Sequence, residues 1–184
     1  MKSSYRDKNY GLLFMALVDI HEPKLVVELG VLKGYALNHL SNGKTDKDCK
    51  FIGIDLFEDY EYNHASFEEV KEYFDERYPQ VELRKQDAFE AAKDFEDESV
   101  DILHIDLSNT CDILEKAFDH WSPKVRKDGI VIFEGGSEER DNVEWMKKYN
   151  KTPIKYFKRF IGYRGYECVT LVPFPSITIC RKVQ

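Results

Sequence analysis

The stretch Leu25–Leu40 reads LVVELGVLKGYALNHL and joins an apolar run to a segment that looks helical. The run at 25–27 has the length and β-branched content of a buried strand. Gly30 and Gly34 follow in a tight turn, where glycine tolerates a positive φ and lets a ligand approach the backbone. Ligands of open α/β sheets bind at the carboxyl ends of the strands, so this turn is predicted to face a ligand.

The charge of this turn indicates what kind of ligand it holds. Glu28 stands at the strand end, where its carboxylate can accept a hydrogen bond from a charged amine. A dinucleotide-binding turn has the spacing GxGxxG and cradles a pyrophosphate, whereas ELGVLKG lacks that spacing and places a negative charge where a phosphate would be repelled. The motif predicts a cationic or zwitterionic ligand. A tight strand-to-helix turn without any ligand is the alternative.

Further apolar runs continue the same pattern along the chain. Short runs typical of buried strands lie at residues 51–54, 81–83, 100–105 and 130–133. Apolar residues with helical spacing lie at residues 10–20, 67–74, 113–121 and 143–146. Strands that alternate with helices are typical of a parallel α/β sheet, because a parallel crossover needs a dozen or so residues.

The C-terminal part departs from this alternation. Two β-rich runs within residues 166–183 are joined by Pro173-Phe174-Pro175, a link too short for a crossover helix, and they predict an antiparallel hairpin. We therefore predict a doubly wound, mostly parallel, seven-stranded α/β sheet of Rossmann-like type with a C-terminal antiparallel hairpin, in a single domain spanning 1–184. Two polar stretches, 58–69 and 137–142, are interpreted as exposed connections.

Composition bounds the partners and the compartment. The 184 residues carry a net charge of −7, which disfavours nucleic acid or anionic lipid as a partner. No apolar run approaches the ~20 residues that span a bilayer, and the N-terminus has no signal-peptide pattern, so we expect a cytoplasmic protein without a membrane partner. The aromatic content of 14% is compatible with a homodimer.

The four cysteines show no pairing pattern. They are Cys49, Cys111, Cys168 and Cys180, widely spaced and without a CxxC pair, so the sequence predicts buried thiols and neither a zinc site nor a disulfide.

Acidic residues recur where strands end. Asp55 ends the run at 51–54, in the position that holds ribose hydroxyls in doubly wound nucleotide sites. Asp87 follows the run at 81–83 and precedes Ala88, where an aspartate can accept from an adenine amino group. Glu28, Asp55 and Asp87 thus form one predicted constellation at three strand ends.

With these motifs the chain resembles the class I S-adenosylmethionine-dependent methyltransferases, from Val26 to Lys182. The resemblance implies S-adenosylmethionine as cofactor and transfer of its methyl group to an acceptor. It also implies that Glu28, Gly30 and Gly34 surround the methionine part of the cofactor, that Asp55 contacts the ribose, and that Asp87 and Ala88 contact the adenine.

The stretch HIDLSNTCD (104–112) resembles the small-molecule O-methyltransferase branch, which carries HID, two variable residues and a histidine, and a pair of acids after the next strand. Asp106 matches, and we expect it beside the cofactor and the acceptor, with Glu134 as the second catalytic acid. Asn109 replaces the histidine, and Gly135 follows Glu134 where a second acid is expected. We therefore assign no metal ligands, although Mg²⁺ held through several waters stays an alternative.

The leading prediction is methylation of a small molecule, at oxygen. The missing histidine favours one alternative, a non-catalytic or repurposed cofactor-binding domain. Residues 145–166 favour another, a nucleic-acid methyltransferase, because they contain seven basic residues, six aromatic Tyr and Phe residues and no acid. A solvated helix face followed by an edge strand is the preferred interpretation of that segment. His104, inside an apolar run, is interpreted as a core histidine.

Overall fold

The computed structural model describes residues 3–44 and 48–184. By its internal contacts the chain divides into two compact units, Met1–Asp94 and Phe95–Gln184. Together their strands make up the predicted seven-stranded, mostly parallel sheet with an antiparallel C-terminal pair, so the predicted fold class is confirmed. The assignment of a single domain to residues 1–184 stays a prediction.

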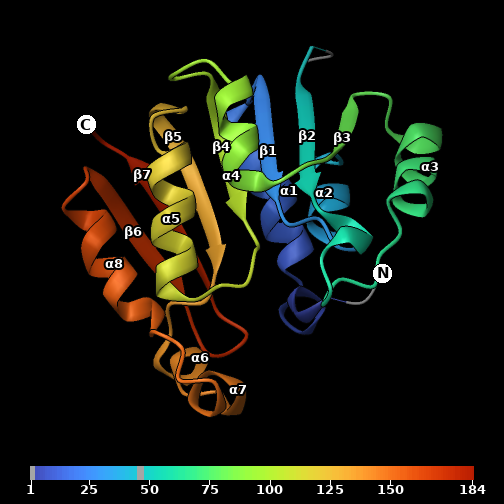
Figure 1. Ribbon diagram of the computed structural model, residues 1–184. Helices are drawn as coiled ribbons and strands as arrows, with labels where there is room; N and C mark the ends of the chain where they lie inside the picture. Colours follow the sequence, from blue (N-terminus) through green and yellow to red (C-terminus); the bar gives the residue numbers. More distant parts are fainter. Residues whose placement is uncertain (1–2, 45–47) are drawn as a thin grey trace. The chain divides into compact units, whose positions relative to one another are not determined.

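Three parallel strands form the centre of the first unit, in the order β3-β2-β1 (Figure 1). They are β1 (Leu25–Leu29), β2 (Lys50–Asp55) and β3 (Val81–Lys85). The register places Glu28 opposite Gly53 and Asp55 opposite Lys85. Because the strands are parallel, their carboxyl ends share one edge, and the acids that follow them are brought to that edge.

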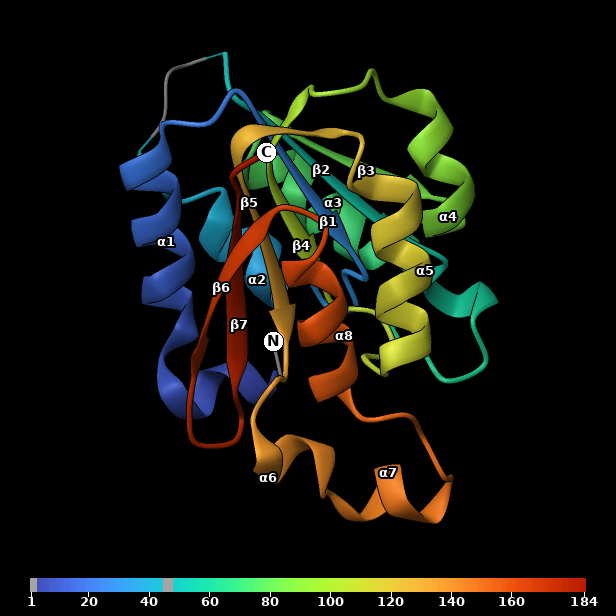
Figure 2. The same ribbon diagram turned by 90° about the vertical axis from the view of Figure 1, so that its left-hand side faces the viewer.

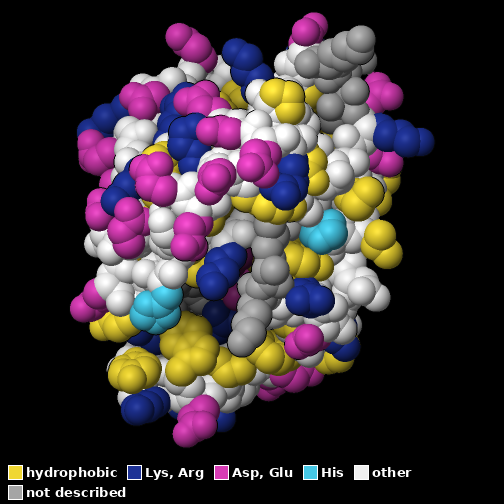
Figure 3. Space-filling model, turned by 90° about the vertical axis from the view of Figure 1, so that its right-hand side faces the viewer, with side chains coloured by type: hydrophobic (Ala, Val, Ile, Leu, Met, Phe, Trp, Pro, Cys, Tyr) yellow, Lys and Arg dark blue, Asp and Glu magenta, His cyan; other side chains and the backbone are white. Residues whose placement is uncertain are grey.

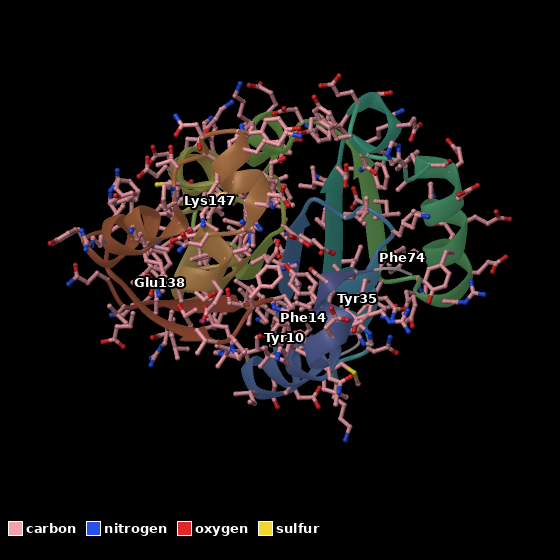
Figure 4. The ribbon with its side chains drawn as sticks, turned by 90° about the horizontal axis from the view of Figure 1, so that it is seen from below. Tyr10, Phe14, Tyr35, Phe74, Glu138 and Lys147 are labelled. Carbon is pink, nitrogen blue, oxygen red and sulfur yellow. A yellow bond between two sulfur atoms is a disulfide. The ribbon has the colours of Figure 1, made fainter. Side chains whose placement is uncertain are left out.

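The helices of the first unit are α1 (Tyr10–His21), α2 (Tyr35–Leu40), α3 (Phe67–Arg77) and α4 (Ala88–Ala91), with 3-10 turns at Ser4–Lys8, Phe57–Asp59 and Ala92–Asp94. Helix α1 packs on α2, and Figure 4 shows Tyr10 and Phe14 of α1 beside Tyr35 of α2. Ser66 caps α3 by accepting from the Glu69 N–H at 3.4 Å. The outer face of α3 carries charges of both signs, including the Lys71–Asp75 pair (Figure 3).

The second unit holds the remaining four strands, in the order β4-β5-β7-β6. They are β4 (Val100–Ile105), β5 (Val125–Glu134), β6 (Tyr166–Leu171) and β7 (Ile177–Lys182), and its helices are α5 (Cys111–Trp121), α6 (Glu138–Asp141), α7 (Glu144–Lys148) and α8 (Ile154–Gly162). Strands β4 and β5 are parallel, whereas β7 runs antiparallel to both β5 and β6. Helices α5 and α8 lie side by side (Figure 2), with the rings of Phe118 and Phe157 5.7 Å apart.

The prediction of four buried thiols is wrong for two of the cysteines. Cys168 and Cys180 form a disulfide between β6 and β7. The strand register places the two residues directly opposite each other, although 12 positions separate them in the sequence. Cys49 and Cys111 carry buried thiols that form no disulfide, as predicted. Spacing alone missed the bridge because cross-strand pairing depends on the hairpin register.

Within residues 3–44 and 48–184, none of the helices combines the length and the apolar character that crossing a membrane requires.

Candidate functional site

The end of β1 places a buried carboxylate close to the glycine that begins the following turn. Glu28 is 1% exposed, and burial together with the nearby charge of Asp55 raises the pKa of Glu28 well above its usual range. A hydrogen bond from the Leu37 backbone N–H, in the first turn of α2, acts in the opposite direction. The next residue but one, Gly30, has a φ of 84°, a conformation that L side chains rarely adopt. Glu28 and Gly30 therefore lie together at the end of β1, as predicted.

Gly34 has a second role that the sequence did not indicate. Its φ is 76° and it precedes α2 as the N-cap residue. A Cβ atom at this position would lie 2.6 Å from Cε2 of Phe74, which is fully buried on α3. Glycine is thus required here for the packing of α3 as well as for the turn. Its predicted contact with the cofactor stays a prediction.

Asp55 is held by four protein donors. Its Oδ2 accepts from the backbone N–H groups of Val31 and Leu32, at 2.7 and 2.8 Å. Its Oδ1 accepts from the backbone N–H of Phe57 at 2.7 Å and from Asn63 Nδ2 at 2.9 Å. An ionised carboxylate offers about four acceptor sites. Asp55 therefore fastens the turn after β1 to the end of β2, and a ribose hydroxyl would have to share or replace one of these donors.

Asp87 also caps a helix. Its Oδ1 accepts from the backbone N–H groups of Phe89 and Glu90 at 2.9 and 3.0 Å, which fixes the start of α4. Ala88, the first residue of α4, is 6% exposed. Both residues follow β3, at the edge that also carries Glu28 and Asp55. The predicted contact with adenine stays a prediction.

In the second unit, the two predicted catalytic acids are linked by Asn109. Its amide Nδ2 lies 3.4 Å from Oδ1 of Asp106, and the same side chain donates a hydrogen bond to Glu134. Asn109 is 1% exposed, and it is not the N-cap of α5, a position taken by Thr110. The residue that replaces the expected histidine therefore connects the ends of β4 and β5 with amide N–H groups.

Glu134 is an acid in a mostly buried position. Burial raises its pKa, and the charges of Arg140 and His104 together with the Asn109 hydrogen bond oppose that shift. His104 is fully buried, as expected of a core histidine, and burial lowers its pKa despite the nearby carboxylates of Asp106 and Glu134. A carboxylate with a raised pKa accepts a proton more readily than an exposed one.

Sequence reasoning missed Arg140. It lies in SEERDN (137–142), which was interpreted as an exposed connection, yet it is 3% exposed. Its Nε lies 3.8 Å from Oε1 of Glu134, and its Nη2 donates to the backbone oxygen of Asn109 at 3.2 Å. The Trp145 ring lies against the guanidinium, 4.9 Å from centroid to Cζ. The interpretation holds for Glu138, Glu139 and Asn142, which are exposed, and is wrong for Ser137, Arg140 and Asp141, because polar side chains can be buried when their charges and hydrogen bonds are paired.

Its neighbour Asp141 is also buried, at 9% exposure. The Asp141 carboxylate accepts from the backbone N–H groups of Ile154 and Lys155, at 2.6 and 3.1 Å. These are the first two residues of α8, so Asp141 stabilises the start of that helix.

The basic segment 145–166 presents a smaller stacking surface than its composition suggests. Phe157 is fully buried and Tyr166 is 5% exposed, while Tyr149, Tyr156 and Tyr163 are exposed. The segment contains α8 and the first residue of β6, the strand at the end of the order β4-β5-β7-β6. The helix face and the edge strand of the preferred interpretation are both present, and nucleic-acid binding by this segment stays a prediction.

The profile of a family described as "Methyltransferase domain" matches residues 27–134, which run from β1 to the end of β5. The chain belongs to this methyltransferase-domain family. The match includes the turn after β1 and the acids Asp55, Asp87, Asp106 and Glu134.

Solved structures share the fold of this methyltransferase domain at low sequence identity. The O-methyltransferase TomG of Streptomyces achromogenes, solved with S-adenosylmethionine, has a TM-score of 0.70 at 15% identity and covers 98% of this chain and 86% of its own. The S-adenosylhomocysteine-bound methyltransferase PaMTH1 of Podospora anserina has a TM-score of 0.72 at 15% identity, covering 100% and 80%. A methyltransferase of Geobacter sulfurreducens has a TM-score of 0.69 at 18% identity, covering 98% and 85%.

A curated relative of the methyltransferase domain is the uncharacterized protein y4gI of Sinorhizobium fredii, 28% identical over 139 residues. The match covers 67% of this chain but only 14% of y4gI, so the chain corresponds to a small part of that protein.

Proposed function

We propose that this domain is an S-adenosylmethionine-dependent methyltransferase that methylates a small-molecule acceptor at oxygen. The observation that carries the proposal is the end of β1, where buried Glu28 stands two residues before Gly30. Asp55 and Asp87 lie at the ends of the next two strands. Membership of the methyltransferase-domain family supports the reaction type. The structural likeness to an O-methyltransferase solved with S-adenosylmethionine supports the cofactor and the choice of oxygen.

The first unit suits the methionine end of this cofactor. A zwitterionic amino acid brings a charged amine, and the Glu28 carboxylate provides an acceptor of opposite charge in a buried position. Gly30 presents backbone without a side chain at the same turn. Asp87 and Ala88 would line the adenine. Asp55 would reach the ribose by sharing an oxygen now bonded to Asn63, the side-chain donor in its set.

When bound, S-adenosylmethionine supplies a methyl group on a positively charged sulfur whose departure leaves a neutral thioether. The residues of this chain must hold the acceptor hydroxyl in line and receive its proton. Glu134, with its raised pKa, is the proposed proton acceptor. Asp106 is linked to Glu134 through the Asn109 side-chain amide, which donates to both acids.

A divalent cation fits the second-unit acids poorly. Amide N–H groups of Asn109 point at both Asp106 and Glu134, and these positive ends occupy oxygens that a cation would need. Arg140 adds a positive charge 3.8 Å from Glu134. We therefore propose that proton removal in this site relies on side chains and not on a metal held by these two acids.

The test is calorimetric titration with S-adenosylmethionine and S-adenosylhomocysteine, with and without Mg²⁺, on the wild type and two glycine variants. Gly30→Val should abolish binding, because the side chain blocks the backbone at a φ of 84°. Gly162→Val is the matched control, since a Cβ atom there meets no atom within 4 Å. Thermal melting of each variant separates lost binding from lost folding.

Absence of binding by the wild type would contradict the proposal. Binding without turnover of any hydroxylated acceptor would favour the alternative, a non-catalytic cofactor-binding domain. A binding or activity signal that appears only with Mg²⁺ would contradict the metal-independent part.

A further inference from the structure

The second unit contains a buried donor and a buried acceptor that no described residue satisfies. Among residues 3–44 and 48–184, Nη1 of Arg140 and Oδ1 of Asn109 have no hydrogen-bond partner. Both side chains are more than nine-tenths buried, at 3% and 1% exposure. A buried charged donor without a protein partner loses its hydration without compensation, so such a group in a folded protein indicates a bound water, a ligand or a catalytic role.

These two atoms belong to the side chains that surround Glu134. The other Arg140 nitrogens are engaged, Nε toward Glu134 and Nη2 with the Asn109 backbone oxygen. The Asn109 amide nitrogen is likewise engaged with Asp106 and Glu134. These side chains leave a cationic N–H donor of Arg140 and a carbonyl oxygen of Asn109 unsatisfied, as is the hydroxyl of the neighbouring Thr110, among the described residues. The Arg140 N–H can donate to the oxygen of a hydroxyl group whose proton faces Glu134.

We propose that Arg140 binds the oxygen of the acceptor hydroxyl and stabilises its negative charge as Glu134 takes the proton. This inference rests on the proposed function and names the group that replaces a metal in it. A divalent cation assists such reactions by lowering the pKa of a bound hydroxyl. A guanidinium that donates to the same oxygen does so through charge and hydrogen bonding, and it stays protonated throughout.

The charges balance through the step. Before reaction the Arg140 cation faces the Glu134 anion at 3.8 Å, and the acceptor hydroxyl is neutral. The proton moves from the hydroxyl to the Glu134 carboxylate, which becomes neutral, and the negative charge moves to the acceptor oxygen. Arg140 thus faces one anion before and after the proton transfer, so that step leaves no uncompensated buried charge. Methyl transfer then neutralises the oxygen, and Glu134 returns its proton to solvent.

Arg140 also contacts an aromatic side chain that is partly exposed. The ring of Trp145, from α7, lies against the guanidinium and is 39% exposed. Figure 4 places Lys147 on the same short helix and Glu138 on α6. Of the contacts that Arg140 makes, the one with Trp145 involves no hydrogen bond. Moving the Trp145 ring away therefore costs less interaction free energy than breaking the other contacts.

The test uses 4-nitrophenol, a phenol whose ionisation changes its absorption spectrum, with the protein saturated with S-adenosylhomocysteine. On the wild type we expect the ratio of ionised to neutral probe to be at least about tenfold higher for bound than for free probe at the same pH, which equals a pKa lowered by about one unit. Arg140→Gln should abolish this enhancement, and Arg140→Lys should reduce it because lysine lacks the guanidinium fork. Arg164→Gln is the matched control. Arg164 pairs with Asp119, with 3.4 Å between Nη2 and Oδ1, and neither residue is among the contacts described for Arg140.

Three results would overturn the proposal. They are failure of the probe to bind the loaded wild type, equal ionisation of the probe on wild type and Arg140→Gln, and loss of the ionisation on treating the wild type with a chelator. If Arg140→Gln does not fold, an unchanged spectrum on Arg140→Lys overturns the proposal in its place. Calorimetry with S-adenosylhomocysteine distinguishes failure of the Arg140 proposal from failure of the proposed function, because only absence of that binding contradicts the proposed function itself.

Discussion

Phe74 fills the space that a side chain at Gly34 would need. A Cβ atom built on Gly34 would lie 2.6 Å from Cε2 and 2.9 Å from Cζ of the Phe74 ring. The contact joins the start of α2 to α3, 40 residues apart in the sequence. A glycine predicted to admit a ligand therefore also admits an aromatic ring of the protein core.

Gly34→Ala should destabilise the protein by about 2–4 kcal/mol, from the clash with Phe74 and from the positive φ of 76°. Denaturant unfolding measures the change. The double variant Gly34→Ala/Phe74→Leu should lose less stability than the two single variants lose in sum, because removing the ring relieves the clash. Additive losses would show that the ring does not restrict position 34.

Asp55→Asn should be more destabilising than its small chemical change suggests. An amide can offer only one oxygen, so its nitrogen must face backbone N–H donors that Asp55 now satisfies, those of Val31 and Leu32 or that of Phe57. We expect a loss of about 2–4 kcal/mol, since hydrogen bonds to charged groups contribute about 1.5–3 kcal/mol each. Urea unfolding and hydrogen exchange at the Val31 and Leu32 amides measure it.

The matched control for this change is Asp87→Asn. Asparagine is as good an N-cap residue as aspartate, so the Asp87 bonds to Phe89 and Glu90 should survive with little change in stability. Equal effects of the two substitutions would contradict the role of Asp55 as the fastening of the turn after β1.

Glu28→Gln should change how stability depends on pH. The pKa of Glu28 is raised in the folded protein. Its contribution to the free energy of unfolding is therefore fully present below 4.5, the pKa in the unfolded chain, and is lost as the pH rises through the pKa in the folded protein. The variant lacks this loss, so the free energy of unfolding of the variant relative to that of the wild type should rise as the pH increases. It should also bind S-adenosylmethionine more weakly, because the charge opposite the amine is gone.

Unfolding free energies across this pH range test the prediction, with Glu72→Gln on the exposed face of α3 as the control. A constant difference between Glu28→Gln and the wild type at every pH would show that Glu28 does not titrate differently in the folded and unfolded protein.

The Cys168–Cys180 bridge predicts a redox-dependent stability. Closing a loop with a sequence separation of 12 restricts the unfolded chain, and its loss should reduce stability by about 3 kcal/mol. Reductant should therefore lower the melting temperature of the wild type but not that of Cys168→Ser/Cys180→Ser. Titration of thiols in the unfolded, unreduced protein should count two, those of Cys49 and Cys111. A count of four would contradict the bridge.

The sequence by itself determined the alternation of strands and helices and the placing of acids at strand ends. Both depend on local signals, namely the periodicity of apolar residues and the alternation of side chains between the two faces of a strand. These signals are present in the sequence whatever the tertiary contacts are. Glu28, Asp55 and Asp87 were located in this way, whereas Asp106 and Glu134 were assigned from the resemblance to the O-methyltransferase branch. The closing hairpin followed from the shortness of its proline-containing link.

Only the tertiary structure decided what these side chains bond to. Asp55 takes two of its donors from residues 23 and 24 positions away, and the cysteine pair depends on the register of β6 and β7. Arg140 is buried because Glu134 and the Asn109 backbone compensate its charge, and no local pattern in SEERDN encodes those partners. Burial of a polar group is favourable only when its partners are in place, and those partners are assembled by folding and not by neighbours in the sequence.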